Sequence, residues 1–340
     1  MSVLSAHQPE LFPYQGFWQK ACAADEFLLL TSYETIGPKR STNYQSKQRI
    51  GGWKGRTQMR IPTDERMGNA PFTEVGILND AVQDSLPWIE GHLLKIRQAY
   101  GWNSDLSPLT SDRDALATLE RHRQLRSSTS RSERDRRESA PYFERFFPEV
   151  ESLYRAEHST LADLNTAFID LFVDAFGITT PMTRSDGIDH DTSRFDDLES
   201  RMHEHGIDAV RGELGSVVDY LAEHGDIALP RAEAIERLYA DLKDGRNGMV
   251  TSTGAPKEHK LRATLKLVRL LQETGHDTYL SGSGAEGYVV DSVFDIAGKS
   301  NEYFHAKPAP YRQLHSDTFD PYLGGLDMLF TLGALPEDRA

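Results

Sequence analysis

The chain has a single cysteine, Cys22, among its 340 residues. One thiol can form neither an internal disulfide nor a cysteine-rich zinc site, so the fold must be held by its core. Cys22 is also the only thiol available as a nucleophile. Its position beside Ala21 and Ala23, on an expected helix, favours a buried structural cysteine over a reactive one.

Long apolar segments are missing as well. The most apolar run, residues 27–30, is far shorter than the roughly 20 residues that cross a bilayer. The N-terminus does not have the basic and then apolar layout of a signal peptide. We therefore expect a cytoplasmic protein without a membrane span. With 340 residues and 38% hydrophobic content, the chain can bury a core in one large domain or two.

Basic residues are outnumbered, with 38 Lys and Arg against 52 Asp and Glu, and the net charge is −14. This balance argues against a general nucleic-acid-binding surface. One Ser-rich and Arg-rich segment, residues 121–139, departs from it. A solvated surface loop and a docking site for RNA or an acidic carrier protein both fit that composition. Its arginines are Arg121, Arg123, Arg126, Arg131, Arg134, Arg136 and Arg137.

The N-terminal stretch is the most informative part of the chain. Residues 3–6 form a short apolar strand by pattern, a helix is predicted after Pro13, and residues 27–30 form a second apolar strand. A crossover this short, with a helix in it, predicts two parallel strands of one sheet. His7 and Gln8 then lie just past the carboxyl end of the first strand, where α/β proteins bind ligands.

A second strand and loop of this kind lie near the C-terminus. Residues 277–280 are a predicted buried strand, and residues 285–297 a predicted helix. Between them lies a loop of small residues, Ser281, Gly282, Ser283 and Gly284. Such a loop can present backbone amides to an anion, although a simple tight turn is the alternative. Because this loop and His7 both follow strands, we expect them to open onto one crevice.

Residues 36–56 combine many hydrogen-bond donors and glycines with few apolar residues. A loop that wraps an anion fits this composition, with Lys47 and Arg49 as the expected contacts. A solvated hairpin is the alternative.

The middle of the chain is predicted to be helical. Apolar spacing predicts amphipathic helices over residues 84–100 and 160–176, with Gly177 ending the second. His92 is expected on the surface of the first helix. Residues 187–260 show three further helical patterns among many acidic residues, at residues 195–205, 216–224 and 231–242.

Three histidines in this acidic part raise the question of a metal site. They are His190, His203 and His205. No pair of them has the HExxH spacing that holds a metal between two imidazoles. We therefore expect a solvated acidic face and no metal.

Several short motifs occur along the chain in an order that resembles the WbqC-like protein family. They are His7-Gln8-Pro9, Pro13-Tyr14-Gln15-Gly16-Phe17, Arg49-Ile50, Ile61-Pro62, Ile77-Leu78-Asn79-Asp80, Trp88, His92, Ile96, Tyr100, Ala140-Pro141-Tyr142-Phe143, Leu161-Ala162-Asp163-Leu164-Asn165, Asp277-Thr278-Tyr279-Leu280-Ser281-Gly282, Tyr288, Pro310-Tyr311, Asp327 and Leu329-Phe330. Residues 101–139 and 187–260 interrupt the pattern. Residues 31–34 also depart from it, because the family carries acidic residues and a Gln there.

The predicted fold is α/β, with a mainly parallel sheet and helical insertions. Its element order is similar to that of the HUP class of nucleotide-binding proteins. The expected organisation is an N-terminal α/β part (1–100), an inserted Arg-rich loop (101–139), a helical part (140–186), an acidic helical insertion (187–260) and a C-terminal α/β part (261–340) that completes the same domain.

The resemblance implies a transferase that moves a glycyl-type aminoacyl group, or a related acyl group, onto an amine of a sugar or another small molecule. Such an enzyme would serve O-antigen, other glycoconjugate or secondary-metabolite biosynthesis. The donor could be carried by a tRNA or a carrier protein. No cofactor is evident from the sequence, although ATP with Mg²⁺ fits a nucleotide-binding crevice.

In this scheme each candidate residue has a role. His7 is the general base, since imidazole titrates near neutral pH, and Lys20 or the Ser281–Gly284 amides stabilise the oxyanion. Asp25 or Glu34 orients the base. Gln8, Lys47 and Arg49 contact substrate, Arg49 holding an acidic donor, and Tyr288 shapes the pocket.

Two alternatives to acyl transfer remain open. An ATP-dependent nucleotidyl- or adenylate-forming enzyme would use the same crevice. A non-catalytic binding protein is favoured if His7 and Ser281 lie far apart in the fold.

Overall fold

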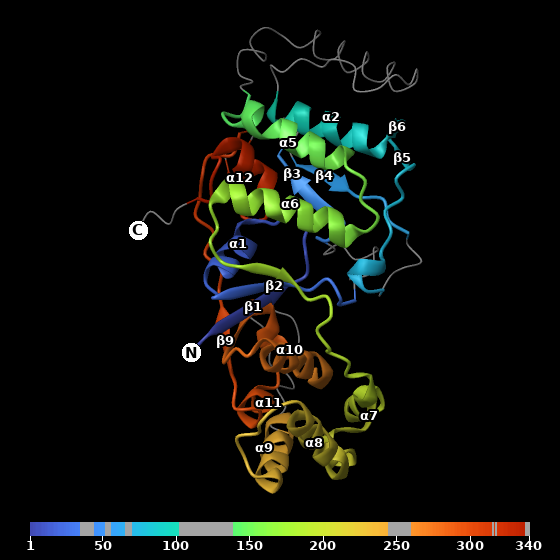
Figure 1. The fold of residues 1–340 in the computed structure, drawn as a ribbon, viewed down its shortest axis with the longest axis vertical. Helices are drawn as coiled ribbons and strands as arrows, with labels where there is room; N and C mark the ends of the chain where they lie inside the picture. Colours follow the sequence, from blue (N-terminus) through green and yellow to red (C-terminus); the bar gives the residue numbers. More distant parts are fainter. Residues whose placement is uncertain are drawn as a thin grey trace. The chain divides into compact units, whose positions relative to one another are not determined.

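The computed structural model describes residues 1–34, 44–51, 56–64, 70–101, 139–243, 260–314, 316 and 318–336. Residues 121–138 of the predicted Arg-rich segment (121–139) and residues 36–43 and 52–55 of the predicted anion loop lie outside these ranges. The chain forms two compact units that interleave along the sequence (Figure 1). Unit 1 contains residues 1–7, 20–28 and 180–306, and unit 2 contains residues 8–19, 29–179 and 307–340.

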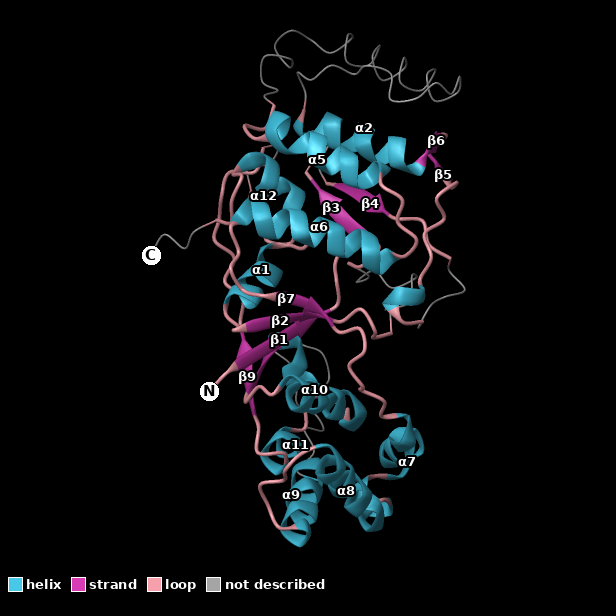
Figure 2. Ribbon diagram, viewed as in Figure 1, coloured by secondary structure: helices cyan, strands magenta, loops and turns pink. Residues whose placement is uncertain are grey.

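Unit 1 is built on a five-stranded parallel sheet with the strand order β7-β2-β1-β8-β9 (Figure 2). The strands are β1 (Val3–His7), β2 (Glu26–Leu29), β7 (Met182–Arg184), β8 (Thr278–Gly282) and β9 (Ser300–Phe304). The central residues of β1 and most of β8 are buried, as expected for parallel strands covered on both faces. The predicted α/β fold with a mainly parallel sheet is confirmed.

The helices of unit 1 agree with the sequence patterns, with one difference. They are α7 (Asp196–His205), α8 (Leu214–His224), α9 (Arg231–Lys243), α10 (Leu261–Thr274) and α11 (Asp291–Ile296). The helix predicted over residues 285–297 is instead a short 3₁₀ helix, η6 (Ser283–Gly287), followed by α11. The break has a local cause. Val290 is buried and extended, and its backbone N–H donates to the Thr264 hydroxyl rather than continuing a helix.

The order of the strands shows where the sheet changes its direction of growth. β1 pairs with β8 in parallel, with Val3 opposite Thr278 and Ser5 opposite Leu280. β2, which follows β1 in the sequence, lies beside β1 on the side away from β8. β9, which follows β8, lies beside β8 on the side away from β1. Because such crossovers are right-handed, the two connections cover opposite faces. The topological switch point therefore lies between β1 and β8.

The described residues of unit 2 are mainly helical and include two small hairpins. Its helices are α2 (Trp88–Tyr100), α5 (Phe143–Arg155), α6 (Leu161–Phe176), α12 (Gly325–Thr331) and the 3₁₀ helix η2 (Phe72–Glu74); α1 (Gln15–Cys22) begins in unit 2 and ends in unit 1. The hairpins pair β3 (Lys47–Ile50) with β4 (Thr57–Arg60), and β5 (Val82–Gln83) with β6 (Leu86–Pro87).

The predicted helix over residues 160–176 is confirmed, and its ends show why. The Thr160 hydroxyl accepts a hydrogen bond from the Asp163 amide at the N-terminus. Gly177 takes the left-handed conformation at the C-terminus, with φ of 65°. Phe168 and Phe172 from this helix pack edge-on against Phe12 in the unit 2 core.

Two expectations about single residues are wrong. His92 is fully buried rather than on the helix surface, because it packs between Trp88 and Tyr154. Cys22 is exposed rather than buried, because it ends α1 on the side away from its buried neighbour Ala21.

Candidate active site

His7 and the small-residue loop lie at the same edge of the unit 1 sheet. His7 is the last residue of β1, and Gly282 is the last residue of the neighbouring strand β8. The register that pairs Ser5 with Leu280 places His7 beside Gly282 when it is continued by two residues. This is the carboxyl end of both strands at the topological switch point, where open α/β sheets bind ligands.

The side chains of His7 and Ser281 nevertheless belong to opposite faces of the sheet. Successive side chains of a strand alternate between faces. In the observed register His7 shares its face with Gly282, and Gly282 lies opposite Phe304 of β9. Ser281 lies opposite Tyr303 and shares the face of Tyr279, whose ring packs 6.5 Å from that of Phe294 in α11. His7 and Ser281 are thus neighbours along the edge but do not face each other.

Ser281 belongs to a polar network inside unit 1. Its hydroxyl donates a hydrogen bond of 2.6 Å to Oδ1 of Asn301, and the side chain is 1% exposed. Asn301 Nδ2 donates to Asp291 at 3.4 Å, and the Tyr303 hydroxyl donates to the same carboxylate oxygen at 3.2 Å. The predicted ligand-binding hydroxyl therefore holds β8, β9 and α11 together.

Gly282 and Gly284 have room around them. A Cβ built on either glycine meets no atom of the described protein within 4 Å, and neither has a positive φ. Packing and backbone conformation therefore do not require glycine at these two positions. Glycines in open space beside a strand end allow a ligand to approach the backbone closely.

A carboxylate and an imidazole meet at the end of the next strand. Nε2 of His305, the residue after β9, lies 3.1 Å from Oε1 of Glu286 in η6. The His305 side chain is 56% exposed and that of Glu286 is 21% exposed. Neither residue of this pair was predicted from the sequence to lie in the site. Ser300–Phe304, the edge strand before His305, does not alternate polar and apolar residues, so no local pattern indicates this pair.

Lys20 and Asp25 lie at different ends of β1. Lys20 Nζ donates to the Ala6 carbonyl at 2.8 Å, next to His7, and its side chain is buried above the Phe27 ring. Asp25 accepts a hydrogen bond of 2.8 Å from the amide of Val3. Because Val3 and His7 are four residues apart on a strand, about 13 Å separates them. The structure does not bring Asp25 to His7, so it does not orient that imidazole.

Tyr288 lies behind the loop rather than at the strand ends. Its carbonyl accepts from the amide of Lys260, and Lys260 Nζ lies 5.6 Å from the centre of its ring. Burial raises the pKa of the Tyr288 hydroxyl, so this group stays protonated at neutral pH.

Four of the predicted substrate-binding residues belong to unit 2. Gln8 Nε2 donates to the backbone carbonyl of Glu34 at 2.6 Å, and Gln8 Oε1 accepts from Gln45. The Glu34 carboxylate is exposed. Asn165, fully buried, donates to the carbonyls of Pro9 and Gln45 and fixes this polar layer.

Lys47 and Arg49 lie on the outer face of the β3–β4 hairpin. Gln48 and Ile50, which alternate with them, are buried. Arg60 lies directly opposite Lys47, so this face carries a third cation that the sequence analysis did not single out.

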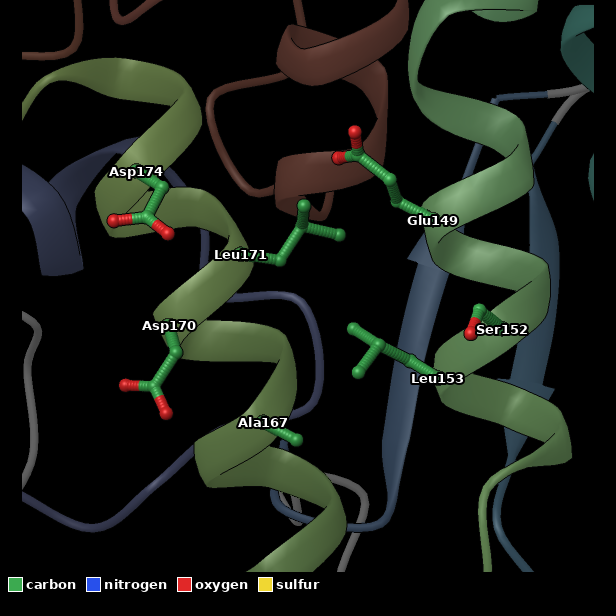
Figure 3. Close-up of a pocket in the computed structure, with 7 residues that line it drawn as sticks. All are labelled: Glu149, Ser152, Leu153, Ala167, Asp170, Leu171 and Asp174. Carbon is green, nitrogen blue, oxygen red and sulfur yellow. The ribbon is translucent and has the colours of Figure 1, made fainter.

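A groove of about 400 Å³ lies elsewhere in unit 2, between α5 and α6. Leu153 and Leu171 point toward one another across it, and Glu149, Asp170 and Asp174 stand at its border (Figure 3). Partial burial, and then the neighbouring Asp174, raise the pKa of Asp170. None of the predicted site residues lines this groove.

Within the described ranges, no group of three or more His, Cys, Asp or Glu side chains is arranged to hold a metal ion. No helix in the part of the chain that the structure describes is long and apolar enough to cross a membrane.

Comparison with known proteins settles the family. The WbqC-like protein family matches residues 8–111, 107–211 and 217–336. The chain belongs to the WbqC-like protein family. The first two matched segments overlap at residues 107–111, and residues 212–216 separate the second from the third. Both junctions lie within residues 101–139 and 187–260, where the motif order is interrupted. No curated protein and no solved structure shows significant similarity to this WbqC-like chain.

Proposed function

We propose that unit 1 of this WbqC-like protein is an acyltransferase, which moves an aminoacyl group of glycyl type, or a related acyl group, onto an amine of a sugar or another small molecule. The observation that carries the proposal is the position of His7 at the switch point, beside a loop whose glycines border open space. An amine that attacks an acyl carbon must lose a proton, and a histidine at this edge supplies a general base.

Other residues of the edge have supporting roles. The Gly282–Gly284 backbone is proposed to stabilise the oxyanion that forms on the acyl group. Lys20 supports the end of β1 through the Ala6 carbonyl and so keeps His7 in place. In unit 2, Lys47, Arg49 and Arg60 are proposed to bind an acidic donor, such as a charged tRNA or an acylated carrier protein. Glycoconjugate or secondary-metabolite biosynthesis in the cytoplasm is the proposed setting.

A ligand screen tests the proposal. Melting temperatures would be measured with glycyl thioesters, sugar nucleotides, and ATP with Mg²⁺, because a ligand that binds only the native state raises the melting temperature. The variants are Gly284→Val, which fills the open space beside the loop, and His7→Gln. His276→Gln is the matched control, because His276 lies before β8, at the opposite edge of the sheet.

The expected result separates binding from chemistry. Acyl donors should stabilise the wild-type protein and the His276→Gln control, and the stabilisation should be lost in Gly284→Val. His7→Gln should bind the donor but form no amide with an amino sugar, as measured by mass spectrometry. Amide formation at the wild-type rate by His7→Gln would contradict the base assignment. The absence of any stabilisation and any amide would favour a non-catalytic binding protein.

A second candidate function rests on the same glycine loop. A loop of small residues at a switch point also suits the phosphates of a nucleotide, as in HUP-like enzymes that form adenylates. Stabilisation by ATP with Mg²⁺ alone, lost in Gly284→Val, would favour this function over acyl transfer from a preformed donor.

A further inference from the structure

We propose that the groove between α5 and α6 binds a small organic cation, in which an ammonium group is joined to an apolar body. Its volume of about 400 Å³ lies in the range of small-molecule sites, and all of its lining residues belong to unit 2. None of the residues assigned to acyl transfer lines the groove, so this inference does not depend on the proposed function.

The centre of the groove is apolar. Leu153 from α5 and Leu171 from α6 point toward one another across it (Figure 3), and Ala167 lies one turn before Leu171. All three side chains are half-buried, so each still presents apolar surface to solvent. An alkyl chain or a ring between the two leucines would remove this surface from water, which favours a ligand with an apolar body.

The border of the groove is acidic and lacks counter-charges. Glu149 stands on the α5 side, and Asp170 and Asp174 stand on the α6 side (Figure 3). None of these three carboxylates forms a salt bridge with a residue that the structure describes. α6 contains no Lys, Arg or His. The arginine one turn before Glu149, Arg145, lies over the Phe146 ring instead, 4.7 Å from its centre.

The charges of Asp170 and Asp174 are unfavourable without a cation. The two residues are four positions apart on α6, where like charges destabilise a helix. Asp174 also lies in the last turn of α6, where the helix dipole favours cations. Partial burial, and then the charge of Asp174, raise the pKa of Asp170. A bound ammonium group would oppose each of these effects, whereas an anion would add to them.

The length of the groove favours a compact ligand over a partner helix. Its α5 wall runs from Glu149 to Leu153 and its α6 wall from Ala167 to Asp174, which are about 6 and 10 Å long. A helix docked over two turns would cover a face about 10 Å long and 10 Å wide. This is far less than the roughly 800 Å² per partner that a stable protein interface buries.

NMR spectroscopy of the full chain with ¹³C-labelled leucine methyl groups tests the proposal. Leu153→Met and Leu171→Met, which nearly keep the side-chain volume, assign the resonances that border the groove. The probes are butyl-, hexyl- and octylammonium. Hexanol is the neutral counterpart of hexylammonium, and hexanoate is the anionic counterpart.

Two double variants separate the groove from the general charge of the protein. Asp170→Asn with Asp174→Asn removes two charges from the border of the groove. Glu144→Gln with Glu157→Gln is the matched control, because both glutamates are exposed and neither lines the groove. Melting temperatures confirm that each variant folds, and Asp174→Asn alone replaces a double aspartate variant that does not.

The expected result depends on both charge and chain length. Hexylammonium should shift the resonances of Leu153 and Leu171 and bind about threefold or more tightly than hexanol, and hexanoate should not bind. Each CH₂ added between butyl- and octylammonium should strengthen binding by up to about fourfold. The double aspartate variant should bind hexylammonium about 2- to 30-fold more weakly, the usual range for two partly exposed ion pairs, and the control should bind it like the wild-type protein.

Three results would overturn the proposal. If hexanol binds as tightly as hexylammonium, or if the two double variants bind hexylammonium equally, the carboxylates do not select a cation. If the affinity does not rise with chain length, or if neither leucine resonance moves, the acidic surface attracts cations but the groove is not a site. If an amphipathic peptide of leucine and lysine moves the same resonances at far lower concentrations than octylammonium, the groove is a docking surface for a basic helix.

Discussion

The Tyr311 hydroxyl donates a hydrogen bond of 2.8 Å to the carboxylate of Asp327, a side chain that is 1% exposed. Tyr100 donates to the other carboxylate oxygen at 3.1 Å, and the amide of Gly51 donates to the Tyr100 hydroxyl. Burial raises the pKa of Asp327 from 3.8 to about 6, although these two tyrosines act to lower it. Unit 2 therefore contains a carboxyl group that titrates close to neutral pH.

This shift predicts a stability that falls as the pH rises. Between pH 3.8 and about 6 the native protein holds a proton on Asp327 that the unfolded chain releases. The stabilisation is fully present below pH 3.8 and lost as the pH rises through 6, on the order of 3 kcal/mol. In urea unfolding between pH 4 and 7, wild-type protein should lose stability relative to Asp327→Asn. If wild-type protein and Asp327→Asn differ by the same free energy of unfolding at every pH, the raised pKa of Asp327 is contradicted.

The burial of His92 predicts a pH effect on the free energy of unfolding that is opposite in sign to that of Asp327. Burial lowers its pKa from 6.5 to about 3, so the unfolded chain takes up a proton between these pH values and the native protein does not. The stabilisation is present above pH 6.5 and lost as the pH falls toward 3. His92→Gln should flatten the acid limb of the urea-unfolding profile. Tyr154→Phe is the control, because it removes the 3.1 Å contact to Nδ1 but keeps the imidazole.

Ser281→Ala is expected to destabilise the protein rather than to remove a ligand contact. The change leaves Oδ1 of the half-buried Asn301 without its 2.6 Å donor, and the net loss of one such hydrogen bond costs about 1 kcal/mol. Ser283→Ala, two residues along the loop, should cost less than Ser281→Ala. Chemical denaturation of both variants measures this. If Ser281→Ala and Ser283→Ala lose equal amounts of unfolding free energy, the hydrogen-bond network of Ser281 does not contribute to stability.

Replacement by alanine should lower the stability of the protein at Gly325 but not at Gly284. A Cβ on Gly325 would lie 2.8 Å from the Pro13 carbonyl oxygen and 3.2 Å from the Phe172 ring, so Gly325→Ala should cost about 1–3 kcal/mol. A Cβ on Gly284 meets open space, so Gly284→Ala should leave the melting temperature near that of the wild-type protein. A Gly325→Ala protein as stable as Gly284→Ala would contradict the close approach of α12 to Pro13.

The elements that the sequence predicted are those with local signals. The β1-α1-β2 unit follows from two prolines between short apolar runs, and α6 from its periodic apolar face with Thr160 and Gly177 at its ends. The position of Asp25 was also open to prediction, because a residue that precedes a parallel strand lies at the amino edge, away from His7. The assignment of Asp25 to the site overlooked this rule.

What the sequence could not predict depends on register between distant segments. The face of Ser281 is set by its pairing with Tyr303, and no local pattern states that pairing. Glu286 and His305 are 19 residues apart and meet only because η6 and the end of β9 reach the same edge. His92 has the sequence environment of a surface residue, and its burial follows from the packing of α5 against α2.

The pairing of β1 with β8 also constrains how the protein is made. The Ser5 hydroxyl donates to the Leu280 carbonyl across 275 residues of sequence, so β8, the second neighbour of β1 in the sheet, is synthesised long after β1. Until then β1 lacks a neighbour on that side, and contacts of such long range form slowly. A nascent chain stopped before residue 278 should therefore be a substrate for chaperones and proteases, because the sheet of unit 1 cannot yet form.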